Sequence, residues 1–189
     1  MNKKTFFFIL LFGFFAFLVF NFPDFWAWYK TPPFYVFTGQ ASYFDPADIN
    51  NYLAIINYSQ KNKLILAKNL YLTQETKPIF IYFIYSFAGY FLKLSPIKIF
   101  YLLRFLSTIF LVFVLWFLIN FWLTKTVDKI FALFGIVFGG GLGWLFGKRF
   151  IGADVFIGSF TFYEPFTKPH EGLALGFYVL SLTFFIALS

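Results

Sequence analysis

Two carboxylates stand three residues apart in the segment YFDPADINNYLAII, where Asp45 and Asp48 precede a run of apolar residues. Asp45 followed by Pro46 predicts a helix start, because aspartate caps helix N-termini and proline fits the first helical position. An acid in the first turn also gains about 0.3–1 kcal/mol from the helix dipole. Helix capping therefore explains Asp45, whereas Asp48 is a candidate for accepting a proton or for holding a divalent cation.

The helix predicted after Asp45 is amphipathic. Its apolar residues recur at i, i+3, i+4 and i+7, namely Ile49, Tyr52, Leu53 and Ile56. This spacing is typical of one helical face. The segment is too short and too polar to cross a bilayer, so we expect it to lie on the membrane surface.

A second group of ionisable residues lies near the segment FTFYEPFTKPHEG, where Glu164 is followed by His170 and preceded by Asp154. A hydrated loop with two prolines as turn formers would explain these residues. The functional alternative is a second acidic group that faces the first across a cavity. His170, the only histidine, is a candidate acid–base group or metal ligand, as is Asp154.

Several apolar segments have a lysine or an arginine near their ends. Snorkelling of long side chains toward the headgroups is the usual reason for such residues. Arginine also suits phosphate, because its planar guanidinium can bind two oxygens at once. We therefore interpret Lys77 and Arg104 as candidate contacts for a lipid phosphate.

Composition places the whole chain in a membrane. Of its 189 residues 60% are hydrophobic and 12% are charged, against about 25% charged in soluble domains. The net charge of +7 is not gathered in a basic run, which argues against nucleic acid as a partner and suits anionic lipid headgroups.

The absence of cysteine excludes disulfides and thiolate metal sites. The run GGGLGWLFGK fails the P-loop pattern because Leu142 stands where a glycine is required.

Hydropathy predicts an all-α polytopic membrane protein with about four transmembrane helices and two juxtamembrane amphipathic helices. Spans are expected from Phe6 to Phe22, over 105–123, over 130–146 and from Leu173 onward. Lysines before the first span and an aromatic belt after it predict an uncleaved span with a cytoplasmic amino terminus. One transmembrane domain would then cover 1–189, with outer loops at 23–104 and 147–172.

The segment over 77–94 decides the topology. Its polar residues Tyr82, Tyr85, Ser86, Gly89, Tyr90 and Lys93 fall on one helical face, which is typical of an interfacial helix or of a helix that lines a polar cavity. If this segment lies flat, both acidic loops share the outer face. If it crosses as a fifth span, the two loops lie on opposite faces, and the charge pattern does not decide between these alternatives.

The segments DINNYLAI, ETKPIFIYFIYSFAGYFLKL and LLRFLSTIFLVF together resemble the opening of GT-C membrane glycosyltransferases. The nearest resemblance is to the family 39-like group, which holds protein O-mannosyltransferases and the lipid A aminoarabinose transferase. In that pattern an acid precedes a tyrosine by four residues, a Lys-Pro opens a juxtamembrane helix and an arginine opens the next span. Asp48 with Tyr52, Lys77 with Pro78, and Arg104 match it. The later GGGLGW and FTFYEPFTKPHEGLAL are also similar to bacterial proteins of this kind.

This resemblance implies an inverting transferase that moves a hexosyl or pentosyl group at the outer face of the cell (inner) membrane. The donor would be a polyprenyl-phosphate-linked sugar, and the acceptor a glycan, a lipid or a protein. By the same resemblance Asp48 is the catalytic or metal-positioning acid, Glu164 the second outer-loop acid, and Lys77 and Arg104 approach the lipid phosphate. Mg²⁺ or Mn²⁺ is the expected cofactor, if any.

The resemblance further implies that these residues form the amino-terminal part of a longer transferase core. Two alternatives from other classes stay open. In a non-catalytic membrane subunit the acids are helix caps and the glycines are packing sites. In a lipid or solute transporter, Glu164 and His170 would lie in the transport path, which requires ionisable residues at membrane depth.

Overall fold

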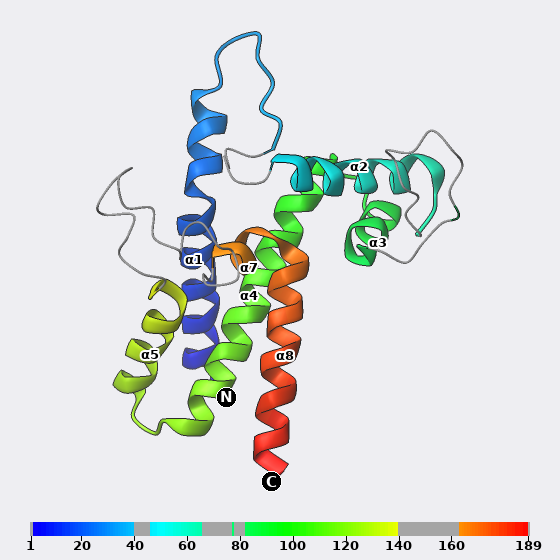
Figure 1. Ribbon diagram of the computed structural model, residues 1–189. Coiled ribbons are helices and arrows are strands. Elements are labelled where there is room, and N and C mark those ends of the chain that lie inside the picture. The colour runs from blue at the N-terminus through cyan, green and yellow to red at the C-terminus, as the bar shows by residue number, and fades with distance from the viewer. Residues whose placement is uncertain (1, 40–45, 66–76, 78–81, 140–162, 189) are drawn as a thin grey trace. The chain divides into compact units, whose positions relative to one another are not determined.

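The computed structural model describes residues 2–39, 46–65, 77, 82–139 and 163–188, and the regular structure in these residues is helical (Figure 1). Their helices are α1 (Lys3–Lys30), α2 (Pro46–Asn62), α3 (Phe83–Phe91), α4 (Pro96–Trp122), α5 (Thr126–Phe138), α7 (Tyr163–Thr167) and α8 (Pro169–Leu188). The predicted all-α class is thus confirmed for the described residues. The chain forms two compact units, one of Met1–Phe20 with Arg104–Ser189 and the other of Asn21–Leu103.

Three helices in the described part of the chain are long and apolar enough to cross a membrane. They are α1, α4 and α8, with 28, 27 and 20 residues. At about 1.5 Å per residue these helices measure roughly 42, 40 and 30 Å, and the hydrocarbon core of a bilayer is about 30 Å thick. Their length and composition therefore support an integral membrane protein, as the sequence predicted.

The third predicted span, over 130–146, is not a spanning helix within the described residues. There α5 has 13 residues and its C-cap is Gly139, so the helix is about 20 Å long. Gly139 opens a run of three glycines, and glycine is a poor helix former. The residues from 140 to 146 lie outside the described part of the chain.

The predicted helix over 77–94 is shorter than expected. Its described part, α3, has nine residues and is preceded by Tyr82 in a left-handed conformation with φ of 51°. A helix of about 14 Å covers less than half of the hydrocarbon core. The alternative of a fifth span through α3 is therefore not supported, while residues 78–81 lie outside the description.

In the first unit α1 runs antiparallel to α4. Phe8 contacts Trp116 with ring centroids 5.5 Å apart, and Phe17 contacts Phe105 at 5.4 Å. Later residues of α1 therefore contact earlier residues of α4, as expected for two helices that run in opposite directions. The two helices approach closely between these contacts, at Gly13.

Helix α8 runs parallel to α4. The rings of Phe110 and Phe177 are 5.0 Å apart, and those of Phe117 and Phe184 are 6.0 Å apart. Both helices descend side by side in Figure 1. Consequently α4 and α8 enter the first unit from the same end.

Helix α5 and the short α7 complete this end of the first unit. Phe20 of α1 stacks on Phe138 of α5 at 5.6 Å and on Phe166 of α7 at 4.6 Å. Phe12, which comes earlier on α1, contacts Phe134, which comes earlier on α5, at 4.9 Å. Helix α5 therefore runs parallel to α1. We call the end marked by Phe20, Arg104, Phe138 and Phe166 the entry end.

The second unit is built on the amphipathic stripe predicted for α2. Ile49, Tyr52 and Ile56 are 3%, 1% and 0% exposed, and they share a core with residues of α3 and α4. Gln60 fixes the far end of α2, since its Nε2 donates hydrogen bonds to the carbonyl oxygens of Leu92 and Leu94 at 2.9 and 2.7 Å. The predicted surface helix is thus held in place by a hydrophobic core and by the hydrogen bonds of Gln60.

Close packing of α2 on α3 requires a glycine. A Cβ at Gly89 would lie 2.5 Å from the carbonyl oxygen of Ile56 and 3.0 Å from its Cα. Both are backbone atoms, so neither can move without shifting a helix. Gly89→Ala is expected to destabilise the protein by about 1–3 kcal/mol and to lower the midpoint of thermal unfolding in detergent.

Gly135→Ala is the matched control for this substitution. A Cβ at Gly135 meets no atom within 4 Å, and alanine is favoured over glycine inside a helix by about 1 kcal/mol. This variant should therefore unfold at the wild-type temperature or above it. Equal effects of the two substitutions would contradict the close approach of α2 and α3.

The face of α3 that the sequence marked as polar points inward. Tyr85 and Ser86 are both fully buried. Phe83, Phe87 and Phe91 are exposed by 39%, 43% and 58% and follow one another at i, i+4 and i+8. An exposed apolar stripe on a helix beside candidate spans is typical of a helix that lies in the membrane interface.

A single cysteine in place of Phe87, labelled with an environment-sensitive fluorophore, tests this placement. We expect blue-shifted emission and quenching by spin-labelled lipids, because the side chain would lie among acyl chains. Asn57, exposed on α2, is the matched control site and should report a more aqueous environment. Equal quenching at the two sites would overturn the assignment of the Phe stripe to lipid.

Candidate functional site

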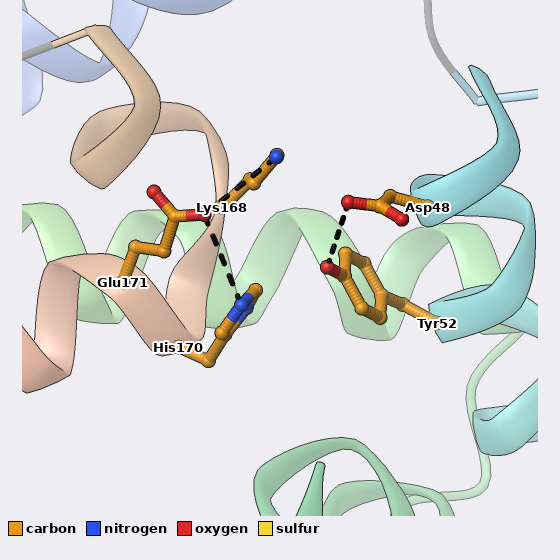
Figure 2. A network of polar contacts seen from close by, with 5 residues as sticks. All are labelled: Asp48, Tyr52, Lys168, His170 and Glu171. Carbon is orange, nitrogen blue, oxygen red and sulfur yellow. Dashed lines mark hydrogen bonds and ion pairs between the residues drawn. The ribbon is translucent and has the colours of Figure 1, made fainter. Parts of the chain in front are cut away.

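Asp48 lies in the first turn of α2, one turn before Tyr52. The Tyr52 hydroxyl donates a hydrogen bond to Asp48 Oδ2 at 3.4 Å, as Figure 2 shows. This distance exceeds the usual 2.7–2.8 Å of an O–H···O bond, so the contact is weak. It orients the carboxylate more than it stabilises it.

Tyr52 is itself held in place by aromatic packing. Its side chain is 1% exposed and stacks on Tyr85, with centroids 4.5 Å apart and planes at 12°. Tyr82 packs edge-on against it at 5.1 Å. Since Tyr52 cannot change rotamer without breaking these contacts, its hydroxyl is a fixed donor for Asp48.

Tyr82 also carries backbone strain. Its φ of 51° lies in the left-handed region, which bulky residues rarely adopt. Strained conformations of this kind cost about 1–3 kcal/mol and cluster at functional sites. In this conformation the partly exposed ring of Tyr82 lies beside Tyr52, the residue that contacts Asp48.

The second ionisable group lies where α7 meets α8. Glu171 Oε1 is 3.6 Å from Lys168 Nζ and 4.0 Å from His170 Nε2 (Figure 2). The side chains of Glu171 and His170 are 32% and 28% exposed, while that of Lys168 is 10% exposed. Glu171 stands in the first turn of α8, where the helix dipole favours an acid.

The other predicted site residues are placed less completely. Glu164 belongs to α7, but its side chain lies outside the description, as do Asp45 and the whole of Asp154. Lys77 is exposed, whereas Arg104 is 1% exposed inside α4. A side chain that is buried to this degree does not extend toward the headgroups, so snorkelling does not explain Arg104.

The predicted site residues belong to two different units of the chain. Asp48 and Lys77 belong to Asn21–Leu103, whereas Arg104, Glu164 and His170 belong to the other unit. A shared site for Asp48 and Glu164 therefore stays a prediction.

Several buried polar residues were not predicted from the sequence, among them three that carry an amide or a charge. Asn21 and Asp24 of α1 are 0% and 6% exposed, and Lys168 is 8% exposed. Asp24 lies about 9 Å before the end of α1, so ionisable residues are not confined to segment ends. A carboxylate inside an apolar run was the available signal, because such residues are rare in spans without a function.

The expected Mg²⁺ or Mn²⁺ stays a prediction, because Asp45, Asp154 and the side chain of Glu164 lie outside the described residues. Among the described side chains, no group of three or more Asp, Glu or His residues gathers closely enough to hold a metal ion. Divalent cations of this kind prefer several oxygen ligands.

Comparison with known proteins adds no relative. No family model matches the chain, and neither does any curated protein or solved structure.

Proposed function

We propose that this chain belongs to a membrane glycosyltransferase that moves a sugar from a polyprenyl-phosphate-linked donor to an acceptor at the outer face of the membrane. The motifs of the GT-C resemblance are its starting point. The oriented acid at Asp48, at the start of an amphipathic helix, supports it further.

The observation that carries the proposal is the direction of the helices in the first unit. Because α1 is antiparallel to α4 and α4 is parallel to α8, the chain leaves α1 and enters both α4 and α8 at the entry end. The segments that hold Asp48 and Glu164 then connect at one side of the bundle. This arrangement supports a single outer face for both acids.

The proposed reaction is a displacement at the anomeric carbon of the donor. Asp48 accepts the proton of an acceptor hydroxyl or amine while the acceptor atom forms its bond to that carbon. The bond between the anomeric carbon and the phosphate oxygen breaks, and the phosphate leaves with the electron pair. Attack opposite the leaving group inverts the configuration. Cationic side chains stabilise the charge that develops on the phosphate.

A transporter is the second candidate, and one observation favours it. Asp24 is a buried acid within a candidate span, and ionisable residues at membrane depth often mark transport paths. Since α1 exceeds the hydrocarbon core by about 12 Å, Asp24 can lie close to the headgroup level. That position fits an interfacial site as well as a path across the bilayer.

Reconstitution of the complete protein tests the proposal. Proteoliposomes are supplied with a radiolabelled polyprenyl-phosphate sugar and a mixture of glycan, lipid and peptide acceptors, and the release of polyprenyl phosphate is measured. Protein-dependent release with sugar transfer supports the transferase. Movement of the intact donor across the bilayer without cleavage would instead support the transporter.

A further inference from the structure

Helix α8 has an exposed side that is turned away from α4. Gly172, Gly176 and Thr183 mark the side that packs on α4, since all three are buried and a Cβ at Gly176 would lie 2.5 Å from the ring of Phe110. At about 100° per residue, the opposite side of the helix is made by five exposed residues. We call them the α8 seam, and they are Ala174, Tyr178, Ser181, Phe185 and Leu188.

The α8 seam follows a heptad pattern. Its members recur at i, i+4, i+7, i+11 and i+14, which is the spacing that keeps two helices in contact along their length. Two of the members, Ala174 and Ser181, are small and stand one heptad apart. Small residues allow the backbones of two membrane helices to approach closely. The spacing and the side-chain sizes together are typical of a contact between helices.

The exposed side of α1 in the same unit is composed differently. Its exposed side chains over residues 6–19 are all large and apolar, namely Phe6, Phe7, Leu11, Phe14, Phe15, Leu18 and Val19. Such a surface suits acyl chains, which offer no hydrogen-bond partner. The α8 seam differs from it by two hydroxyl groups and two small residues.

Tyr178 is the residue of the α8 seam that acyl chains do not satisfy. It lies near the middle of α8, about 14 Å from either end of the helix, and it is 67% exposed. Its hydroxyl has no hydrogen-bond partner in the part of the chain that the structure describes. The Ser181 hydroxyl differs, because it donates to the carbonyl oxygen of Phe177 at 2.8 Å. An unpaired polar group in hydrocarbon is costly, so α8 favours a neighbour with a hydrogen-bonding group at this depth.

We propose that the α8 seam is the surface through which two copies of this chain associate in the membrane. Copies inserted in the same orientation carry Tyr178 at the same depth, so a two-fold axis along the bilayer normal brings the two seams face to face. A hydroxyl both donates and accepts hydrogen bonds, and Tyr178 can therefore pair with Tyr178 or Ser181 of the second copy. The seam carries no charged residue, so the two copies do not repel each other there. This association does not depend on the proposed sugar transfer.

Cysteine cross-linking of the complete protein in liposomes tests the contact. The chain has no cysteine, so Ala174→Cys and Ser181→Cys each introduce a single thiol close in size to the residue that it replaces. Oxidation at a high ratio of lipid to protein should convert most of each variant to a disulfide-linked dimer. The reason is that a disulfide requires Cα atoms within about 7 Å of each other, as at a close approach of two helices.

Leu11→Cys is the matched control for cross-linking. Leu11 is 52% exposed in the candidate span α1 but lies outside the α8 seam. This variant should stay mostly monomeric under the same oxidation, because only random collisions bring its thiols together. Equal cross-linking of Leu11→Cys and Ser181→Cys would overturn the assignment of the seam.

Association without a cross-link is measured by Förster transfer between copies labelled at the amino terminus, as the liposomes are diluted with lipid. Ser181→Leu places a bulky side chain at the close approach and should weaken association at least about tenfold. Tyr178→Phe removes only the hydroxyl and should weaken it about three- to tenfold. Thermal unfolding of both variants in detergent should match that of the wild type, since these side chains face away from α4.

A seam that faces acyl chains predicts a different result. Lipid accepts leucine and phenylalanine at least as well as serine and tyrosine, so neither substitution would then change the transfer signal. That outcome would overturn the association of two copies. A wild-type chain that stays monomeric in these pure liposomes would overturn it too, and would assign the seam to lipid or to a helix of another protein. Sugar transfer is measured separately, so either result leaves the proposed transferase untouched.

Discussion

Asp48→Asn in the complete protein is expected to lower sugar transfer by about 10²- to 10⁴-fold, the usual contribution of a positioned general base. Asparagine keeps the size of the side chain and can still accept the Tyr52 hydrogen bond, but it cannot take a proton from the acceptor. The loss should therefore appear in kcat, while the affinity for the donor changes little. Transfer is measured with the reconstituted protein and the labelled polyprenyl-phosphate sugar.

Asp45→Asn is the matched control for this prediction. Asparagine caps a helix about as well as aspartate does, so a capping role at Asp45 predicts nearly unchanged transfer and stability. Equal loss in both variants would show that the roles assigned to the two acids are wrong. Normal transfer in Asp48→Asn would remove Asp48 from the chemistry.

Tyr52→Phe distinguishes orientation from proton transfer. Phenylalanine keeps the ring that stacks on Tyr85 and removes only the hydroxyl that contacts Asp48. Because that hydrogen bond is long, we expect a loss of about tenfold or less in kcat. A loss as large as that of Asp48→Asn would indicate that the tyrosine itself touches the reacting atoms.

The start of α2 could be predicted from the sequence because its signals are local. A cap residue, a proline at the first helical position and an apolar stripe all lie within a few turns. The same local spacing identified Asp48 and Tyr52 as neighbours on one face. Helix α2 accordingly begins at Pro46, as expected.

The limits of α3 and α5 could not be predicted in this way. The polar face of α3 is buried because Gly89 lets α2 approach it, and this contact depends on residues far apart in the sequence. An apolar run such as 130–146 indicates only that a segment avoids water, and it does not indicate where a helix ends. Arg104 and Lys168 are buried as well, and burial of this kind depends on how the helices pack, which no local pattern encodes.

Cysteine labelling of intact cells should report both acidic loops on the outer face. The chain has no cysteine, so single cysteines can be introduced at Thr38, before α2, and at Ser159, between α5 and α7 in the sequence. Both are expected to react with a membrane-impermeant maleimide. The reason is that α4 and α8 are parallel, so the segments that precede them start from the same side of the membrane.

Thr124→Cys provides the opposite expectation. Thr124 is exposed between α4 and α5, and α4 would carry it to the cytoplasmic side. It should react only after permeabilisation. Labelling of Thr38→Cys without Ser159→Cys would place Asp48 and Glu164 on opposite faces of the membrane. A shared transferase site would then be excluded, and the buried Asp24 would make transport the better explanation.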